Sequence, residues 1–217
     1  MTAIETEYAG CRFRSRLEAR WAIVFDHLGY EWQYEPEGFE REHYDKTLRY
    51  LPDFYLPEFG TWVEVKGSYE HLSADAEKLA WMCDWGSPLP GVDQSHATTR
   101  GLLVLGEIPK PADALPGFLL IQHSKGLWFN RATLMQHSLL VWDGIARTDY
   151  RSPYGDASWS NDLSQMDPDM DCPPILLWAD GVIAEATDPQ TRWDHAMHAG
   201  RTARFEYGET PVRGGSH

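Results

Sequence analysis

Residues 50–67 read YLPDFYLPEFGTWVEVKG, and this stretch decides the fold that the sequence predicts. Its first part, residues 50–56, and its last part, residues 62–66, show the alternation of side chains that is typical of strands. Pro57–Gly60, between them, is rich in turn-forming residues. We therefore expect two neighbouring strands joined by a short turn.

The alternation of a strand brings the charged side chains of this stretch together. Glu64 and Lys66 share one face of their strand, while the two valines share the other. If the two strands pair, Asp53 reaches the edge that carries Glu64. Two hard carboxylate ligands with open water positions suit Mg²⁺ or Mn²⁺. The pattern predicts a metal that activates a water beside a scissile phosphate, with Lys66 stabilising the developing charge.

A helix is predicted upstream, over Arg14–Gly29. Apolar residues recur there at helical spacing, Ser15 provides an N-cap, and Gly29 suits the C-terminal stop. Glu18 lies three residues after Ser15, which is the spacing of a capping box. Two roles therefore stay open for Glu18, as a group at the metal site and as a cap of its own helix.

These pieces together resemble the PD-(D/E)XK nuclease superfamily. Pro52–Asp53 and Glu64–Lys66 match the two halves of its motif, and Arg14–Trp21 matches its glutamate-bearing first helix. The resemblance covers about residues 8–129. Within it, residues 14–67 are similar to the nuclease core of transposon-end-cleaving and phage-type junction-resolving members.

The resemblance implies an α/β fold with a restriction-endonuclease-like core, in which helices flank a mixed central β-sheet in the order helix–strand–strand–strand–helix–strand. It implies that Asp53 and Glu64 hold Mg²⁺ or Mn²⁺, with the Val65 carbonyl as an extra ligand. Glu18 would bind or tune a second metal, and Lys66 would support the attacking water. The products would carry 5′-phosphate and 3′-hydroxyl ends.

Arginines are concentrated around the start of the first helix. Guanidinium groups bind phosphates, so these side chains are candidates for contact with DNA. A solvated helix start accounts for them equally well. The four residues are Arg12, Arg14, Arg16 and Arg20.

Other elements are predicted along the rest of the core, residues 8–129. They are a strand over 31–35, a polar turn over 40–47, a helix over 73–85 with Ser73 as its N-cap, a buried strand over 101–105, and a hairpin of 118–122 with 127–129. Residues 130–217 form a predicted C-terminal extension that matches no motif. It comprises a mildly helical stretch over 132–142, an acidic loop over about 143–174, a strand at 175–178 and a helix over about 189–206.

Composition limits the class of protein. The chain has 217 residues, of which 42% are hydrophobic and 24% charged, as in globular proteins. Its three cysteines are too few and too far apart for a disulfide framework or a zinc site. No apolar run could cross a bilayer and no phosphate-binding loop motif occurs. We expect a soluble cytoplasmic protein (in the host cytoplasm if phage-encoded) with no membrane partner and no nucleotide cofactor.

The net charge of −14 points away from a protein that simply coats nucleic acid, which would normally be basic. An acidic chain acts on DNA where local arginines and a metal ion handle the phosphates. We predict a metal-dependent DNA endonuclease, which would be a homodimer if it makes two symmetric cuts in branched DNA. One alternative is a non-catalytic module on the same fold that binds nucleic acid or protein. Another is a nucleic-acid mimic that binds a basic protein partner.

Overall fold

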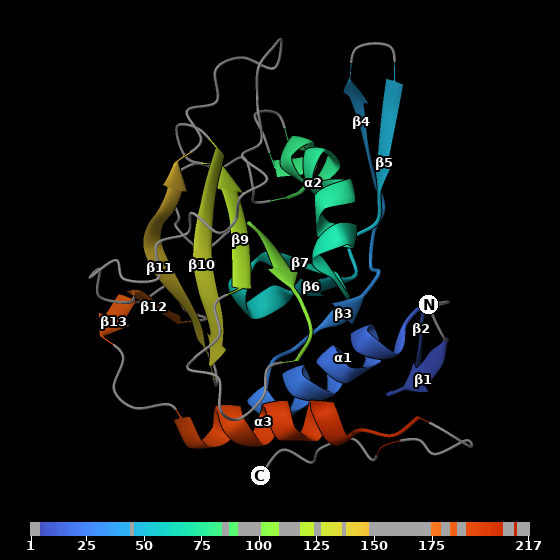
Figure 1. Ribbon diagram of the computed structural model, residues 1–217, viewed down its shortest axis with the longest axis vertical. Coiled ribbons are helices and arrows are strands. Elements are labelled where there is room, and N and C mark those ends of the chain that lie inside the picture. The colour runs from blue at the N-terminus through green and yellow to red at the C-terminus, as the bar shows by residue number, and fades with distance from the viewer. Residues whose placement is uncertain are drawn as a thin grey trace.

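The fold is mixed α/β, with helices packed against a mixed β-sheet (Figure 1). The computed structural model describes residues 5–43, 46–83, 87–90, 101–108, 118–123, 127–135, 138–147, 175–178, 183–185, 190–205 and 211. The helices in these ranges are α1 (Arg16–Leu28), α2 (Tyr69–Cys83), α3 (Gln190–Thr202) and the 3₁₀ turn η1 (Pro57–Phe59). No helix in the described part of the chain is long and apolar enough to span a bilayer.

The main sheet has the order β13-β12-β11-β10-β9-β8-β7-β6-β3. Its strands are β3 (Gln33–Tyr34), β6 (Phe54–Leu56), β7 (Thr61–Val65), β8 (Leu102–Leu105), β9 (Phe118–His123), β10 (Leu127–Met135), β11 (Ser138–Arg147), β12 (Ile175–Trp178) and β13 (Ile183–Glu185). Two separate hairpins pair β1 (Thr6–Tyr8) with β2 (Cys11–Phe13) and β4 (Phe39–His43) with β5 (Lys46–Tyr50).

Helix α1 forms where the sequence predicts it, because both of its ends are capped. Ser15 Oγ accepts a hydrogen bond from the Glu18 amide at 3.2 Å. Gly29 ends the helix at φ +79°, a left-handed conformation that costs glycine little, and its amide bonds to the carbonyl of Asp26. The apolar face of α1 packs onto the sheet.

The strand pair that the sequence predicts is confirmed. β6 and β7 are antiparallel and are joined through η1, and β7 is parallel to β8, with α2 as the connection between those two. Two boundaries were wrong. The first strand begins at Phe54, because Tyr50 belongs to β5, and α2 begins at Tyr69 rather than after Ser73.

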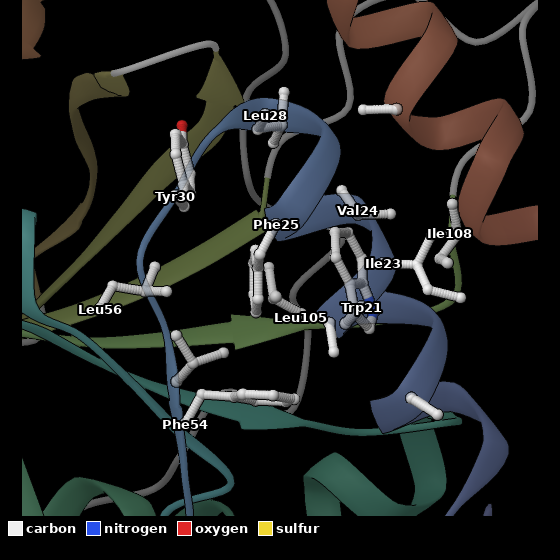
Figure 2. Close-up of a cluster of buried hydrophobic side chains, with 14 of the residues drawn as sticks. Trp21, Ile23, Val24, Phe25, Leu28, Tyr30, Phe54, Leu56, Leu105 and Ile108 are labelled. Atoms are coloured by element: carbon white, nitrogen blue, oxygen red, sulfur yellow. The ribbon is translucent and has the colours of Figure 1, made fainter. Parts of the chain in front are cut away.

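Two hydrophobic clusters cover opposite faces of the sheet. Trp21 and Phe25 of α1 pack with Phe54 on one face, and the rings of Phe25 and Phe54 meet edge-on at 5.3 Å (Figure 2). On the other face, Trp62 packs with Leu79 of α2. Strand alternation separates the clusters, because neighbouring residues of β7 face opposite ways.

Two segments were assigned wrongly from the sequence. Residues 40–43 and 46–47 belong to β4 and β5, which also pair through polar contacts such as Arg49 Nε to Glu40 Oε1 at 2.8 Å. The residues that anchor this hairpin in the core, Phe39 and Tyr50, lie just outside the polar stretch. Residues 132–135 and 138–142 belong to β10 and β11 rather than to a helix, because short apolar runs fit both periods and cross-strand pairing decides between them. β10 also extends beyond residue 129, where the predicted strand 127–129 ended.

The C-terminal elements agree in part with expectation. β12 occupies the predicted strand, and α3 ends at Thr202, short of the predicted residue 206. Thr202 Oγ1 donates to the carbonyl of His198 at 2.9 Å, which satisfies an acceptor of the last turn. Of the predicted acidic loop, residues 143–147 belong to β11 instead, and residues 148–174 lie outside the described residues.

Helix α3 lies alongside α1 because a glycine permits close approach (Figure 1). A Cβ at Gly200 would lie 2.6 Å from Val24 Cγ2 and 2.8 Å from Ile108 Cδ1, closer than side chains tolerate. The rings of His27 and His195 meet at 5.3 Å farther along the pair, so the two helices run antiparallel.

Gly200→Ala should therefore destabilise the protein, although alanine is the better helix former by about 1 kcal/mol. Overpacking costs about 1–3 kcal/mol in a tight contact, so we expect a net loss of about 1 kcal/mol in the free energy of unfolding, measured by urea denaturation. Gly67→Ala is the control, since its nearest contact would be Leu17 Cδ2 at 3.8 Å. A Gly200→Ala protein as stable as the wild type would contradict this packing.

Candidate active site

Three carboxylates lie buried at one end of the sheet. Glu18 is 7% exposed, Asp53 6% and Glu64 5%. They come from α1, from the residue before β6 and from β7 respectively. Burying ionised groups costs several kcal/mol each unless partners compensate, so such a cluster needs a purpose or a counter-charge.

Asp53 is held against the end of β7. Its Oδ2 accepts a hydrogen bond from the Val65 amide at 2.7 Å, and its Oδ1 lies 3.4 Å from Nη2 of Arg14. Burial and then the charge of Glu64 raise the pKa of Asp53 to about 8, with a smaller contribution from Glu18 and against the opposing effects of Val65 and Arg14. Asp53 thus meets the edge that the sequence predicted, in a strongly negative environment.

Glu64 is fixed on both of its oxygens. Oε2 accepts from the hydroxyl of Tyr50 at 2.7 Å, and Oε1 lies 2.8 Å from Nζ of Lys66. Burial, then the charge of Glu64, raises the pKa of Tyr50 well above its usual value, so this hydroxyl stays protonated and donates. Glu64 and Lys66 share the face of the sheet that α2 covers, as strand alternation predicts.

Lys66 bridges two carboxylates. Besides Glu64, its ammonium pairs with Asp75 of α2. Burial lowers the pKa of Lys66, but Glu64 and Asp75 together outweigh that effect, and the net pKa is raised. The lysine is therefore charged at neutral pH and acts as the counter-ion of this end of the sheet.

Glu18 is bound within its own helix start and to β3. Its Oε1 accepts from the hydroxyl of Ser15 at 2.6 Å, and its Oε2 accepts from the hydroxyl of Tyr34 at 2.7 Å and from the Arg14 amide at 3.1 Å. Burial and the bond to Glu18 raise the pKa of Tyr34. The capping role is thus present in the structure, and the role at a metal stays a prediction.

The four arginines do not form one surface. Arg14 lies at the carboxylates and pairs with Glu35 as well as with Asp53. Arg12 is exposed and pairs with Glu5. Arg16 and Arg20 line a pocket between α1 and α3, away from those pairs.

Sequence reasoning missed three residues that hold the site together. Tyr50 and Asp75 each bond to one of the predicted residues, and Tyr34 bonds to two of them, Glu18 and Arg14. Asp75 could have been predicted, because the first turns of the helix that follows β7 must lie near the end of that strand. The two tyrosines could not have been predicted, because their hydroxyls reach the site from strands whose register the sequence does not define.

The donor set fits a magnesium-type ion better than a cage built of protein ligands. Within the described residues, no group of three or more His, Cys, Asp or Glu side chains is arranged to hold a metal. Asp53 and Glu64 supply hard oxygens, and the Val65 backbone lies next to Asp53. Mg²⁺ commonly takes one or two carboxylates and keeps several waters, so Asp53 and Glu64 are the residues that would hold such an ion.

The raised pKa of Asp53 makes the stability of the protein depend on pH. Between about pH 4 and the folded-state pKa of about 8, the folded protein holds a proton that the unfolded chain releases. The free energy of unfolding should then fall as pH rises, by up to about 1.4 kcal/mol per pH unit. Asp53→Asn lacks this titration. Denaturation in EDTA should therefore show that the free energy of unfolding of the variant, relative to that of the wild type, increases from pH 5 to pH 8. A constant difference would argue against the raised pKa.

Tyr50→Phe should destabilise the protein by removing the hydrogen bond that Tyr50 donates to Glu64. The change leaves Oε2 without its donor in a buried place, which costs about 1–3 kcal/mol. Tyr55→Phe is the matched control, because the hydroxyl of Tyr55 makes no hydrogen bond to a described residue. Urea denaturation should show the loss for Tyr50→Phe only, and equal losses would mean that the Tyr50–Glu64 bond contributes little.

The geometry of these residues carries the functional argument. Comparisons of the chain with family models, with curated proteins and with solved structures found no match. The chemistry open to this site follows from its three carboxylates, its lysine and the groups that hold them.

Proposed function

We propose that this protein is a divalent-metal-dependent DNA endonuclease of the PD-(D/E)XK type. The observation that carries the proposal is the meeting of Asp53, Glu64 and Lys66 at the end of one strand pair, in a cluster of buried carboxyl groups. A pKa of about 8 for Asp53 is the mark of a carboxylate that a nearby cation would stabilise.

The arrangement of the elements supports a restriction-endonuclease-like core. In chain order, α1, β3, β6, β7, α2 and β8 give helix, three strands, helix and strand, with the β4–β5 hairpin inserted after β3. β3, β6 and β7 are antiparallel neighbours and β8 is parallel to β7, which makes a mixed sheet. This is the order that the resemblance implies.

Each residue has a defined part in the proposed reaction. Asp53, Glu64 and the Val65 carbonyl would hold Mg²⁺ or Mn²⁺, and Glu18 would lie at a second ion. A metal held there would supply an activated water and would neutralise charge on the phosphate. Lys66 orients the attacking water and stabilises the charge that builds up on the phosphate in the transition state.

The tyrosines are positioning residues in this scheme. Tyr50 fixes the carboxylate of Glu64 from the α2 side of the sheet, and Tyr34 fixes that of Glu18 from β3. Both pKa values are raised, so each hydroxyl remains a donor at the pH of the reaction. Locked carboxylates keep the ligand geometry without reorganisation.

A cleavage assay on single-stranded, duplex, nicked and four-way-branched DNA tests the proposal. Cutting should require Mg²⁺ or Mn²⁺ and stop in EDTA, and it should be lost in Asp53→Asn and in Glu64→Gln. Lys66→Ala should lower the rate by about 10²–10³-fold. Glu40→Gln, on the exposed hairpin, is the control and should cut like the wild type.

A second readout separates metal binding from catalysis. Mn²⁺ should raise the melting temperature of the wild type and of Glu40→Gln, but not that of Asp53→Asn. No cutting of any substrate by the wild type, or equal cutting by the wild type and Asp53→Asn, would refute the enzyme. Tight DNA binding without cutting would favour a binding module on this fold.

A further inference from the structure

A second cluster of charge lies between α1 and α3, outside the acidic site. There a cavity of about 610 Å³ opens to solvent. Its lining contains four arginines and none of the described residues that line it is acidic. The lining residues are Arg16, Arg20, Arg201, Thr202, Ala203, Arg204 and Phe205.

The helix pairing creates this cavity. Arg16 and Arg20 are four residues apart, so they lie on one face of α1. Gly200 lets α3 approach that helix closely, and its neighbours Arg201 and Arg204 are thereby brought opposite the two arginines of α1. Two segments about 180 residues apart in the sequence thus meet to form one positive pocket.

Such a grouping is costly without an anion. Like charges on one helix face repel each other. Carboxylate partners for the 14 arginines are plentiful elsewhere, because the net charge of the chain is −14. Yet neither Arg20 nor Arg204 pairs with a carboxylate of a described residue, and Nε of Arg20 is buried without a hydrogen-bond partner among them. A planar guanidinium is the group that best matches the oxygens of a phosphate.

We propose that this α1–α3 pocket binds a phosphate group, and that the phosphate belongs to the backbone of the nucleic-acid strand that the acidic site engages. The assignment of the source rests on the proposed function. Arg16 begins α1 and Glu18 follows two residues later, so the pocket and the acidic site share the first turn of one helix. The cavity is larger than one phosphate requires, which leaves room for the attached sugar.

Equilibrium binding of labelled duplex and single-stranded DNA in EDTA tests the proposal, because no metal-dependent cutting occurs there. Arg204→Ala and Arg20→Ala should each weaken binding on the order of tenfold and lower the slope of log K against log salt by about one. Arg204→Lys keeps the charge but loses the planar fork, and its affinity should lie between those of Arg204→Ala and the wild type.

Arg49→Ala is the matched control for charge. Arg49 lies on the exposed β4–β5 hairpin, where it pairs with Glu40, and its loss removes the same single charge. Melting temperatures without DNA check that every variant is folded. Equal affinity and equal salt slope for Arg204→Ala, Arg20→Ala and Arg49→Ala would overturn the proposal, even if the wild type cuts DNA.

Pyrophosphate distinguishes the two sources of phosphate. It should raise the melting temperature of the wild type and of Arg49→Ala, but not that of Arg204→Ala. Protection by pyrophosphate without any DNA binding would overturn the nucleic-acid source and assign the pocket to a small phosphate compound. If the protein never cuts DNA but binds it in an arginine-dependent way, the proposed nuclease activity is refuted and the phosphate-binding pocket is supported.

Discussion

The burial of three carboxylates at one end of the sheet is the constraint on which the rest of the structure depends. Glu18, Asp53 and Glu64 are each held by donors from other elements, and Lys66 provides the ammonium that offsets them. The Val65 amide is the central link, because it fixes Asp53 to the strand that carries Glu64 and Lys66. The two hydrophobic clusters hold this end of the sheet from opposite faces, and so keep the acidic groups together.

Part of this arrangement follows directly from the sequence. Alternation along residues 62–66 separates Glu64 and Lys66 from the valines, and Ser15 and Gly29 define a helix by local capping that needs no tertiary contact. These are properties of neighbouring residues. They can therefore be predicted without knowledge of the rest of the chain.

Other parts depend on contacts that local patterns do not encode. The residues that bury the β4–β5 hairpin, Phe39 and Tyr50, lie outside residues 40–47, so the polar pattern of that stretch does not distinguish a hairpin from a turn. Residues 132–142 have apolar runs that suit a helix or a strand, and pairing with β9 and β12 selects the strand. Tyr34 and Tyr50 reach their carboxylates only because of strand register, which is a long-range outcome.

The contact between α1 and α3 has a consequence for how the chain is made. α1 emerges from the ribosome long before residue 190, yet Ala196 and Met197 belong to the cluster that α1 helps to build. During synthesis the side of α1 at Val24 stays uncovered until Gly200 has arrived. A nascent chain can therefore bring its acidic groups together before its arginine pocket is complete, and both are present only once synthesis has passed Phe205.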